Sequence, residues 1–217
     1  MRDITEVLKE LKAFPYEERE ISAAHTGIIR FSDIQEGMRV SGASGKWNEI
    51  PGTLLATITR EKNPFSVNAR ENGIVTEIRR ELDGQFIEAG ERLCVLRHYL
   101  TKQEVVSILL KECLYAYCAT ERARYYFVPE VDKKVKILGC RTVNVTDGME
   151  LFIISRMKRE SVLCYRGPDG IIYDVYFDQS KNVEAGQPLI VVCPPSEQKA
   201  VEEVVAEVQN EWNEGME

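Results

Sequence analysis

The sequence lacks the features of membrane, secreted and nucleic-acid-binding proteins. No apolar run approaches the roughly 20 residues that span a bilayer. The segment from Met1 to Glu6 carries acids where a signal peptide needs basic and then apolar residues. With 28 basic against 35 acidic residues, and a net charge of −7, the chain also lacks the basic surplus of proteins that bind phosphate backbones. We therefore expect a soluble, cytoplasmic protein that binds neither nucleic acid nor membrane.

Metal-binding and catalytic patterns are also missing. The chain has two histidines and six cysteines, none of them in a Cys-x-x-Cys pair, so we expect no metal site. Without a secretory signal, buried reduced thiols are expected rather than disulfides. The Ser41–Trp47 segment does not have the spacing of a phosphate-binding loop and is interpreted as an insertion. No nucleophilic constellation is visible, so we predict a protein without an active site of its own.

Apolar residues recur at helical spacing in three segments. The first ends at Pro15, and the third is expected to begin with Ser196 as its cap. The second opens with a capping box formed by Thr101 and Glu104 and is expected to run to Tyr117. The sequence therefore predicts a helix near each end of the chain and one in the middle.

Between these helices, short apolar and β-branched runs are punctuated by glycine, aspartate and asparagine. Leu54–Ile58, Val135–Leu138 and Leu151–Ile154 are examples that we expect to be strands. Many short strands with turn signals predict small barrels or sandwiches.

The β-rich part of the sequence repeats itself. Ile87–Leu93 recurs, with conservative changes, as Val183–Leu189, 96 residues later. Offsets of 95 to 97 residues relate three further pairs of landmarks, which are Gly52 and Gly148, Gly73 and Gly170, and Thr101 and Ser196. Landmarks that recur in order at one offset indicate a diverged tandem repeat, each copy being followed by a helix.

The second copy resembles the biotinyl/lipoyl-attachment domain family. Asp169–Val175 and Val183–Val192 carry its Gly-Val-Val…Val-x-x-Gly-x-x-Leu pattern. That family folds as a flattened barrel-sandwich of two quasi-symmetric halves, and a tight hairpin between the halves presents the lysine that is biotinylated or lipoylated. The resemblance implies a mainly β fold with flanking α-helices, built from two tandem barrel-sandwich hybrid domains at residues 21–98 and 126–194. Residues 1–20 would be an N-terminal helix and linker, 99–125 a connecting helix and 195–217 a C-terminal helix.

The same resemblance implies the attachment residues. Ser155–Arg159 falls where biotin carriers have Glu-Ala-Met-Lys-Met, so that Lys158 matches the modified lysine and Met157 the methionine before it. In the first copy Lys62 takes the lysine position, 96 residues earlier. The resemblance thus implies covalent biotin on Lys158, with Met157 read by the biotin ligase, and ranks modification of Lys62 by lipoate or biotin behind it.

The chain departs from the family pattern around the second hairpin. Arg156 and Arg159 stand where biotin carriers have alanine and a second methionine. Eleven residues lead from the first-copy lysine to Gly73, as in the family, but twelve lead from the second-copy lysine to Gly170. This spacing predicts one extra residue or a bulge in the second hairpin.

The leading functional hypothesis is a non-catalytic biotin carrier-like subunit. Biotin on Lys158 would shuttle carboxyl groups between active sites of carboxylase- or decarboxylase-type partner subunits, after attachment by a biotin ligase. The alternative is an unmodified two-barrel scaffold that bridges partner proteins. The adaptor of a membrane efflux assembly is ranked below both, because the central helix lies between complete barrels rather than within one.

Overall fold

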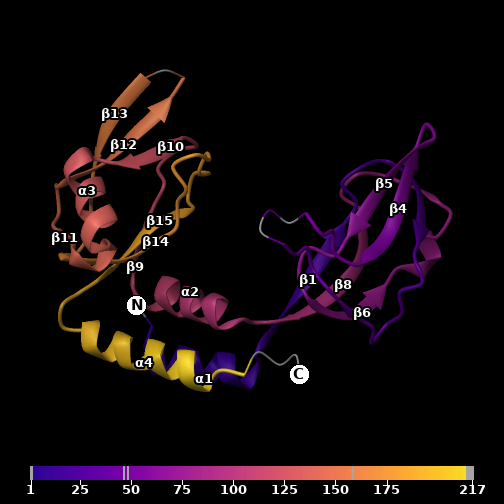
Figure 1. Cartoon of the computed structure of the whole chain (residues 1–217), viewed down its shortest axis with the longest axis horizontal. Coiled ribbons are helices and arrows are strands. Elements are labelled where there is room, and N and C mark those ends of the chain that lie inside the picture. The colour runs from indigo at the N-terminus through magenta and orange to yellow at the C-terminus, as the bar shows by residue number, and fades with distance from the viewer. Residues whose placement is uncertain (1, 46, 48, 158, 214–217) are drawn as a thin grey trace. The chain divides into compact units, whose positions relative to one another are not determined.

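The computed structural model describes residues 2–45, 47, 49–157 and 159–213, and it divides into two compact units (Figure 1). The first unit comprises residues 13–101, and the second unit comprises residues 2–12 together with 102–213. The fold is mainly β. The strands of the described residues form four sheets, and every pair of neighbouring strands in them is antiparallel.

The first unit is built from two facing sheets. Its elements in chain order are β1 (Tyr16–Ser22), β2 (Gly27–Phe31), β3 (Arg39–Val40), β4 (Leu54–Arg60), β5 (Asn63–Asn68), β6 (Gly73–Ile78), the 3₁₀ turn η1 (Arg80–Leu82), β7 (Phe86–Ile87) and β8 (Arg92–Tyr99). The sheet orders are β1-β8-β6-β3 and β5-β4-β2-β7. Inward-facing residues such as Leu55, Ile58 and Val75 are buried between them and form the core.

The second unit contains strands and helices. Its elements are α1 (Ile4–Ala13), α2 (Lys102–Cys113), β9 (Tyr115–Cys118), β10 (Arg124–Phe127), α3 (Pro129–Leu138), the 3₁₀ turn η2 (Cys140–Thr142), β11 (Asn144–Val145), β12 (Glu150–Arg156), β13 (Arg159–Cys164), β14 (Gly170–Val175), β15 (Pro188–Cys193) and α4 (Gln198–Glu211). The sheet orders are β11-β14-β15-β9 and β10-β12-β13.

Strand order in the two units corresponds element by element. β9, β15, β14 and β11 take the places of β1, β8, β6 and β3, while β10, β12 and β13 take those of β2, β4 and β5. β4 and β12 begin 96 residues apart, as do β5 and β13, and β6 and β14 begin 97 apart. The periodicity of the sequence is therefore matched by a periodicity of the fold.

Three helices cover one face of a sheet in the second unit. Leu110 of α2 and Val201 of α4 are buried in one cluster with Tyr173, Val191 and Cys193 of β14 and β15. Apolar residues of α2 and α4 bury their side chains against the sheet, and Ile4 of α1 packs against the same cluster, which is how short amphipathic helices gain stability. α1, α2 and α4 lie together at the end of this unit opposite the β12–β13 hairpin (Figure 1).

The structure corrects the predicted central helix. α2 ends at Cys113 rather than Tyr117, and Tyr115–Cys118 forms strand β9, which pairs with β15. Residues 99–125 are therefore not one connecting helix, because this segment also supplies the edge strand of the second unit. Pairing with β15 satisfies backbone N–H and C=O groups of β9 that would be hydrogen-bonded within the helix if α2 were longer.

Two further predictions of secondary structure are wrong. Val135–Leu138 lies in helix α3 and not in a strand, because Pro129 starts that helix at its first turn, where a missing N–H costs nothing. α4 begins at Gln198 with Glu197 at its N-cap, so Ser196 does not occupy the cap position.

All six cysteines are free thiols, and Cys94, Cys113 and Cys193 are buried. Burial disfavours the thiolate and raises the pKa of each of these three thiols from 9.0 to about 11.

In the part of the chain that the structure describes, no helix is long and apolar enough to cross a bilayer.

Alkylation of the native protein should therefore discriminate among the cysteines. Since the thiolate is the reactive form, a pKa near 11 leaves about 100-fold less of it at pH 8 than an ordinary thiol has. Cys94, Cys113 and Cys193 should react with iodoacetamide more slowly than Cys118 and Cys164, which are only half-buried, as measured by peptide mass spectrometry. All should react at similar rates in urea, and rapid native labelling of the buried three would contradict their placement.

Candidate functional site at the hairpin tips

The first hairpin ends in a two-residue turn. β4 and β5 pair from Leu54 with Asn68 to Arg60 with Asn63, which leaves Glu61 and Lys62 as the loop. Both have positive φ, at 49° and 71°. Positive φ at both central residues is the type I′ conformation, whose twist matches that of paired strands. The turn places the exposed Lys62 at the tip, where the sequence predicted an attachment-type lysine.

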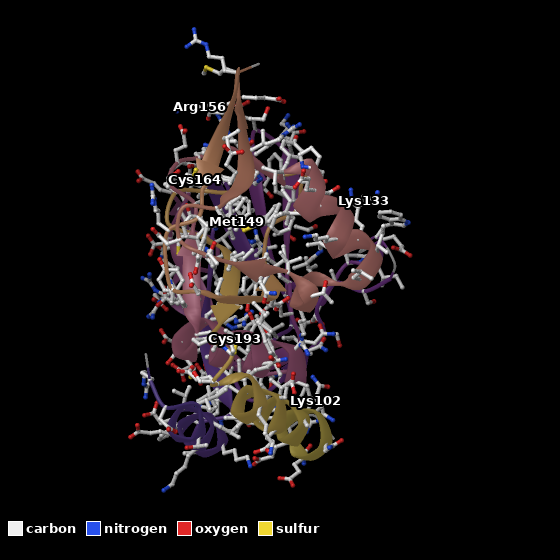
Figure 2. All side chains as sticks on the ribbon, turned by 90° about the vertical axis from the view of Figure 1, so that its left-hand side faces the viewer. Lys102, Lys133, Met149, Arg156, Cys164 and Cys193 are labelled. Carbon is white, nitrogen blue, oxygen red and sulfur yellow. The ribbon has the colours of Figure 1, made fainter. Side chains whose placement is uncertain are left out.

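The second hairpin repeats this register 96 residues later. β12 and β13 pair from Glu150 with Cys164 to Arg156 with Arg159, and the alternation of buried and exposed residues is the same in both hairpins. Met157 follows Arg156 with φ of 47° and is 86% exposed. Lys158, the predicted biotin-attachment residue, lies outside the described residues. Figure 2 shows Arg156 near the protruding end of this hairpin and Cys164 at its base.

The predicted extra residue is not in the second hairpin. Because the registers of the two hairpins correspond from base to tip, the additional residue lies after β13, between Cys164 and Gly170. In that connection the Tyr165 hydroxyl donates to the carbonyl of Pro168 at 2.8 Å. The longer connection is thus closed by a buried tyrosine, and the hairpin length is unchanged.

The strands behind the second tip are anchored in an aromatic core. Phe152 of β12 is fully buried, and its ring centroid lies 5.8 Å from that of Tyr117 and 5.3 Å from that of Phe127. β12 also lies between β10 and β13 in its sheet, so it is paired on both sides. Strands anchored in this way restrain the end of the hairpin, where the described Met157 is exposed to solvent.

The described part of the second tip is basic, although the whole chain is acidic. Arg156 forms an ion pair with Glu121 at 2.7 Å, and the hydroxyl of the buried Tyr125 donates to the backbone carbonyl of Glu121 at 2.7 Å. Arg124 and Arg159 are exposed and have no ion-pair partner among the residues that the structure describes. The sequence did not reveal the Glu121 contact, because the two partners are 35 residues apart.

These hairpins can present side chains but bring together little else. Within the described ranges, no group of three or more histidine, cysteine, aspartate or glutamate side chains is placed to hold a metal ion. A primary amine at the end of a two-residue turn is accessible to another protein from several directions. Such geometry suits a site of covalent attachment or of protein contact.

Comparisons with known proteins add little to this geometry. No protein-family model matches the chain, and no curated protein matches it. One matching solved structure is titled a single-chain, multi-domain long-chain acyl-CoA carboxylase, with 18% sequence identity and a TM-score of 0.31. The match covers 49% of this chain and 10% of the carboxylase chain. A likeness of this extent assigns no family.

Proposed function

We propose that the chain is a non-catalytic carrier-type protein of two tandem barrel-sandwich units, in which Lys158 is the residue that receives biotin. The observation that supports this most is the match between the two hairpins, strand for strand and pair for pair. The second one exposes Met157 next to Lys158 in the sequence, in the order that biotin carriers use. Lys62, on its type I′ turn, is the second candidate, for lipoate or biotin.

The chemistry of a carrier needs placement rather than bond-making. The cofactor supplies the reactive atom, and the protein holds it away from the barrel on a short rigid turn. Tethering raises the effective concentration of the cofactor at each partner active site in turn. The partners in this proposal are a biotin ligase and carboxylase- or decarboxylase-type subunits.

The intact mass of the protein tests the proposal. The full chain is co-expressed with a biotin ligase and excess biotin, alongside Lys158→Arg, Lys62→Arg and the double variant. Arginine keeps the positive charge but offers no amine for acylation. We expect one biotinyl group on the wild type and on Lys62→Arg and none on Lys158→Arg. Unmodified wild-type protein, including protein from the native host, would overturn the carrier proposal.

A scaffold function has its own observation in favour. Ile28 and Phe86 are paired across β2 and β7, and they are 48% and 68% exposed on the outer surface of the first unit. Adjacent exposed apolar side chains are a common feature of protein contact sites. An unmodified chain that uses this surface to bind partners would also explain why Arg156 and Arg159 replace the residues that biotin ligases read.

A further inference from the structure

The first unit contains a cleft between two sheet edges, β1 and β5. Its volume is about 540 Å³, within the range of roughly 300–1,000 Å³ found for small-molecule sites. Most of the residues that line the cleft are polar or charged, among them His25, Arg70 and His98, and the apolar part of the lining includes Ile21, Val67 and Leu96. This cleft contains both histidines of the chain.

The corresponding seam of the second unit, between β9 and β13, is bridged by tyrosines. Tyr117, 96 residues after Ile21, donates its hydroxyl to the carbonyl of Cys164 at 3.0 Å. Tyr115 donates to the carbonyl of Arg166 at 2.6 Å. The groove beside these tyrosines has about 590 Å³ and is more open to solvent than the cleft of the first unit. Isoleucine at position 21 cannot form such a bridge, so the first seam is not closed in this way.

The two seams also differ in charge. Arg166 forms an ion pair with Asp147 at 3.1 Å. Arg70 is 96 residues before Arg166, but the position 96 residues before Asp147 is Pro51, which has no carboxylate. Within the described part of the chain Arg70 has no ion-pair partner.

The two carboxylates on the cleft are both engaged. Glu71 is paired with Arg19, and Glu20 lies 3.4 Å from Arg92. The charge of Arg70 therefore remains available to an anionic group that enters the cleft.

The histidines give the cleft planar walls. His98 is 5% exposed, and its Nδ1 lies 2.7 Å from the backbone carbonyl of Asn72. Because a carbonyl only accepts, Nδ1 carries a proton and donates it, which fixes the orientation of the ring. The exposed ring of His25 packs against Phe65, with 4.4 Å between ring centroids. A flat apolar body fits beside such surfaces.

From these features we propose that the cleft between β1 and β5 binds a small organic anion, with a planar apolar body against His25 and a carboxylate or phosphate on Arg70. An added peptide strand fits the cleft less well. β1 is an edge strand that carries Glu17, Glu18 and Glu20, and charged residues on an edge oppose strand addition.

NMR titration of the full chain tests this proposal. The probes are sodium benzoate, phenyl phosphate and the neutral analogue benzamide, added to ¹⁵N-labelled Lys158→Arg protein so that the result does not depend on biotinylation. We expect benzoate or phenyl phosphate to shift the amide signals of residues 19–25, 66–72 and 96–98. Benzamide should bind at least roughly tenfold more weakly than the tighter anion. The tighter of the two anions identifies the head group.

Matched variants complete the test. Arg70→Ala should weaken benzoate or phenyl phosphate binding by roughly tenfold, because it removes the charge-assisted contact. Arg166→Ala, at the equivalent position of the second unit, should leave binding unchanged. Both arginines are exposed, so neither change should unfold its unit. Absence of shifts at the cleft, equal binding of benzamide, or unchanged binding by Arg70→Ala would each overturn the proposal.

Discussion

Replacing Phe152 by alanine is expected to destabilise the second unit by about 3–5 kcal/mol, the range measured when large aromatic residues are truncated in protein cores. Phe152 is fully buried. Its ring contacts four other aromatic rings, with centroids 5.3 Å to 6.4 Å away, which are those of Tyr117, Tyr125, Phe127 and Phe177. These neighbours belong to two strands, β9 and β10, and to the loop after β14, so they cannot all move inward to fill the cavity.

Urea denaturation measures this effect in the unit concerned. Trp212 belongs to the second unit and is buried, while Trp47 belongs to the first and is 83% exposed, so a Trp47→Phe background makes fluorescence specific to the second unit. Val162→Ala is the control, because Val162 is 55% exposed on β13 and its loss should change the free energy of unfolding by less than about 0.5 kcal/mol. A loss below about 1 kcal/mol for Phe152→Ala would show that the aromatic cluster is not a tightly packed core.

The glycines that begin β6 and β14 give a second large expected effect. A Cβ atom on Gly170 would lie 2.5 Å from the carbonyl oxygen of Cys193, in the paired strand β15. A Cβ atom on Gly73 would lie 2.8 Å from the carbonyl oxygen of Arg97 in β8. Backbone in a paired strand cannot move aside cheaply, so Gly170→Ala and Gly73→Ala should each destabilise their own unit by about 1–3 kcal/mol or more.

Cysteine labelling separates the two outcomes. Cys94 lies in the first unit and Cys193 in the second, and both are buried. Gly73→Ala should speed the alkylation of Cys94 and leave Cys193 protected, whereas Gly170→Ala should do the reverse. Ser161→Ala, on the exposed strand β13, should change neither rate. If both glycine variants kept wild-type labelling, the close approach of the strands would be wrong.

The errors in the predicted secondary structure have identifiable physical causes. Apolar residues continue at helical spacing from α2 into Tyr117, and only the pairing of β9 with β15 ends the helix at Cys113. Val135–Leu138 is a short apolar run, partly β-branched and interrupted by Lys136, as many strands are. Its helical state depends on Pro129 and on the ion pair between Asp132 and Lys136 at 2.6 Å, one turn apart.

The candidate sites that depend on local contacts could be predicted from the sequence, whereas those that depend on long-range contacts could not. Lys62 could be placed at a hairpin tip from the resemblance to attachment domains and the 96-residue repeat, and the structure shows a local two-residue turn there. The ion pair between Arg156 and Glu121 could not be predicted from the sequence, and neither could the cleft of the first unit. That cleft forms where β1 and β5, distant in sequence, bring Ile21 and Arg70 to one surface.

The first unit is inserted into the sequence of the second unit, as an inserted domain is. Residues 2–12 belong with 102–213, and Arg2 forms an ion pair with Glu112 at 2.8 Å. The intervening unit begins and ends on neighbouring strands, where Tyr16 pairs with Tyr99 and the Leu100 amide donates to the Pro15 carbonyl at 3.0 Å. The two ends of the first unit therefore lie next to each other, as they do in domains that are inserted into other domains. Duplication alone would give two domains in series, whereas here the N-terminal helix encloses the first copy within the sequence of the second.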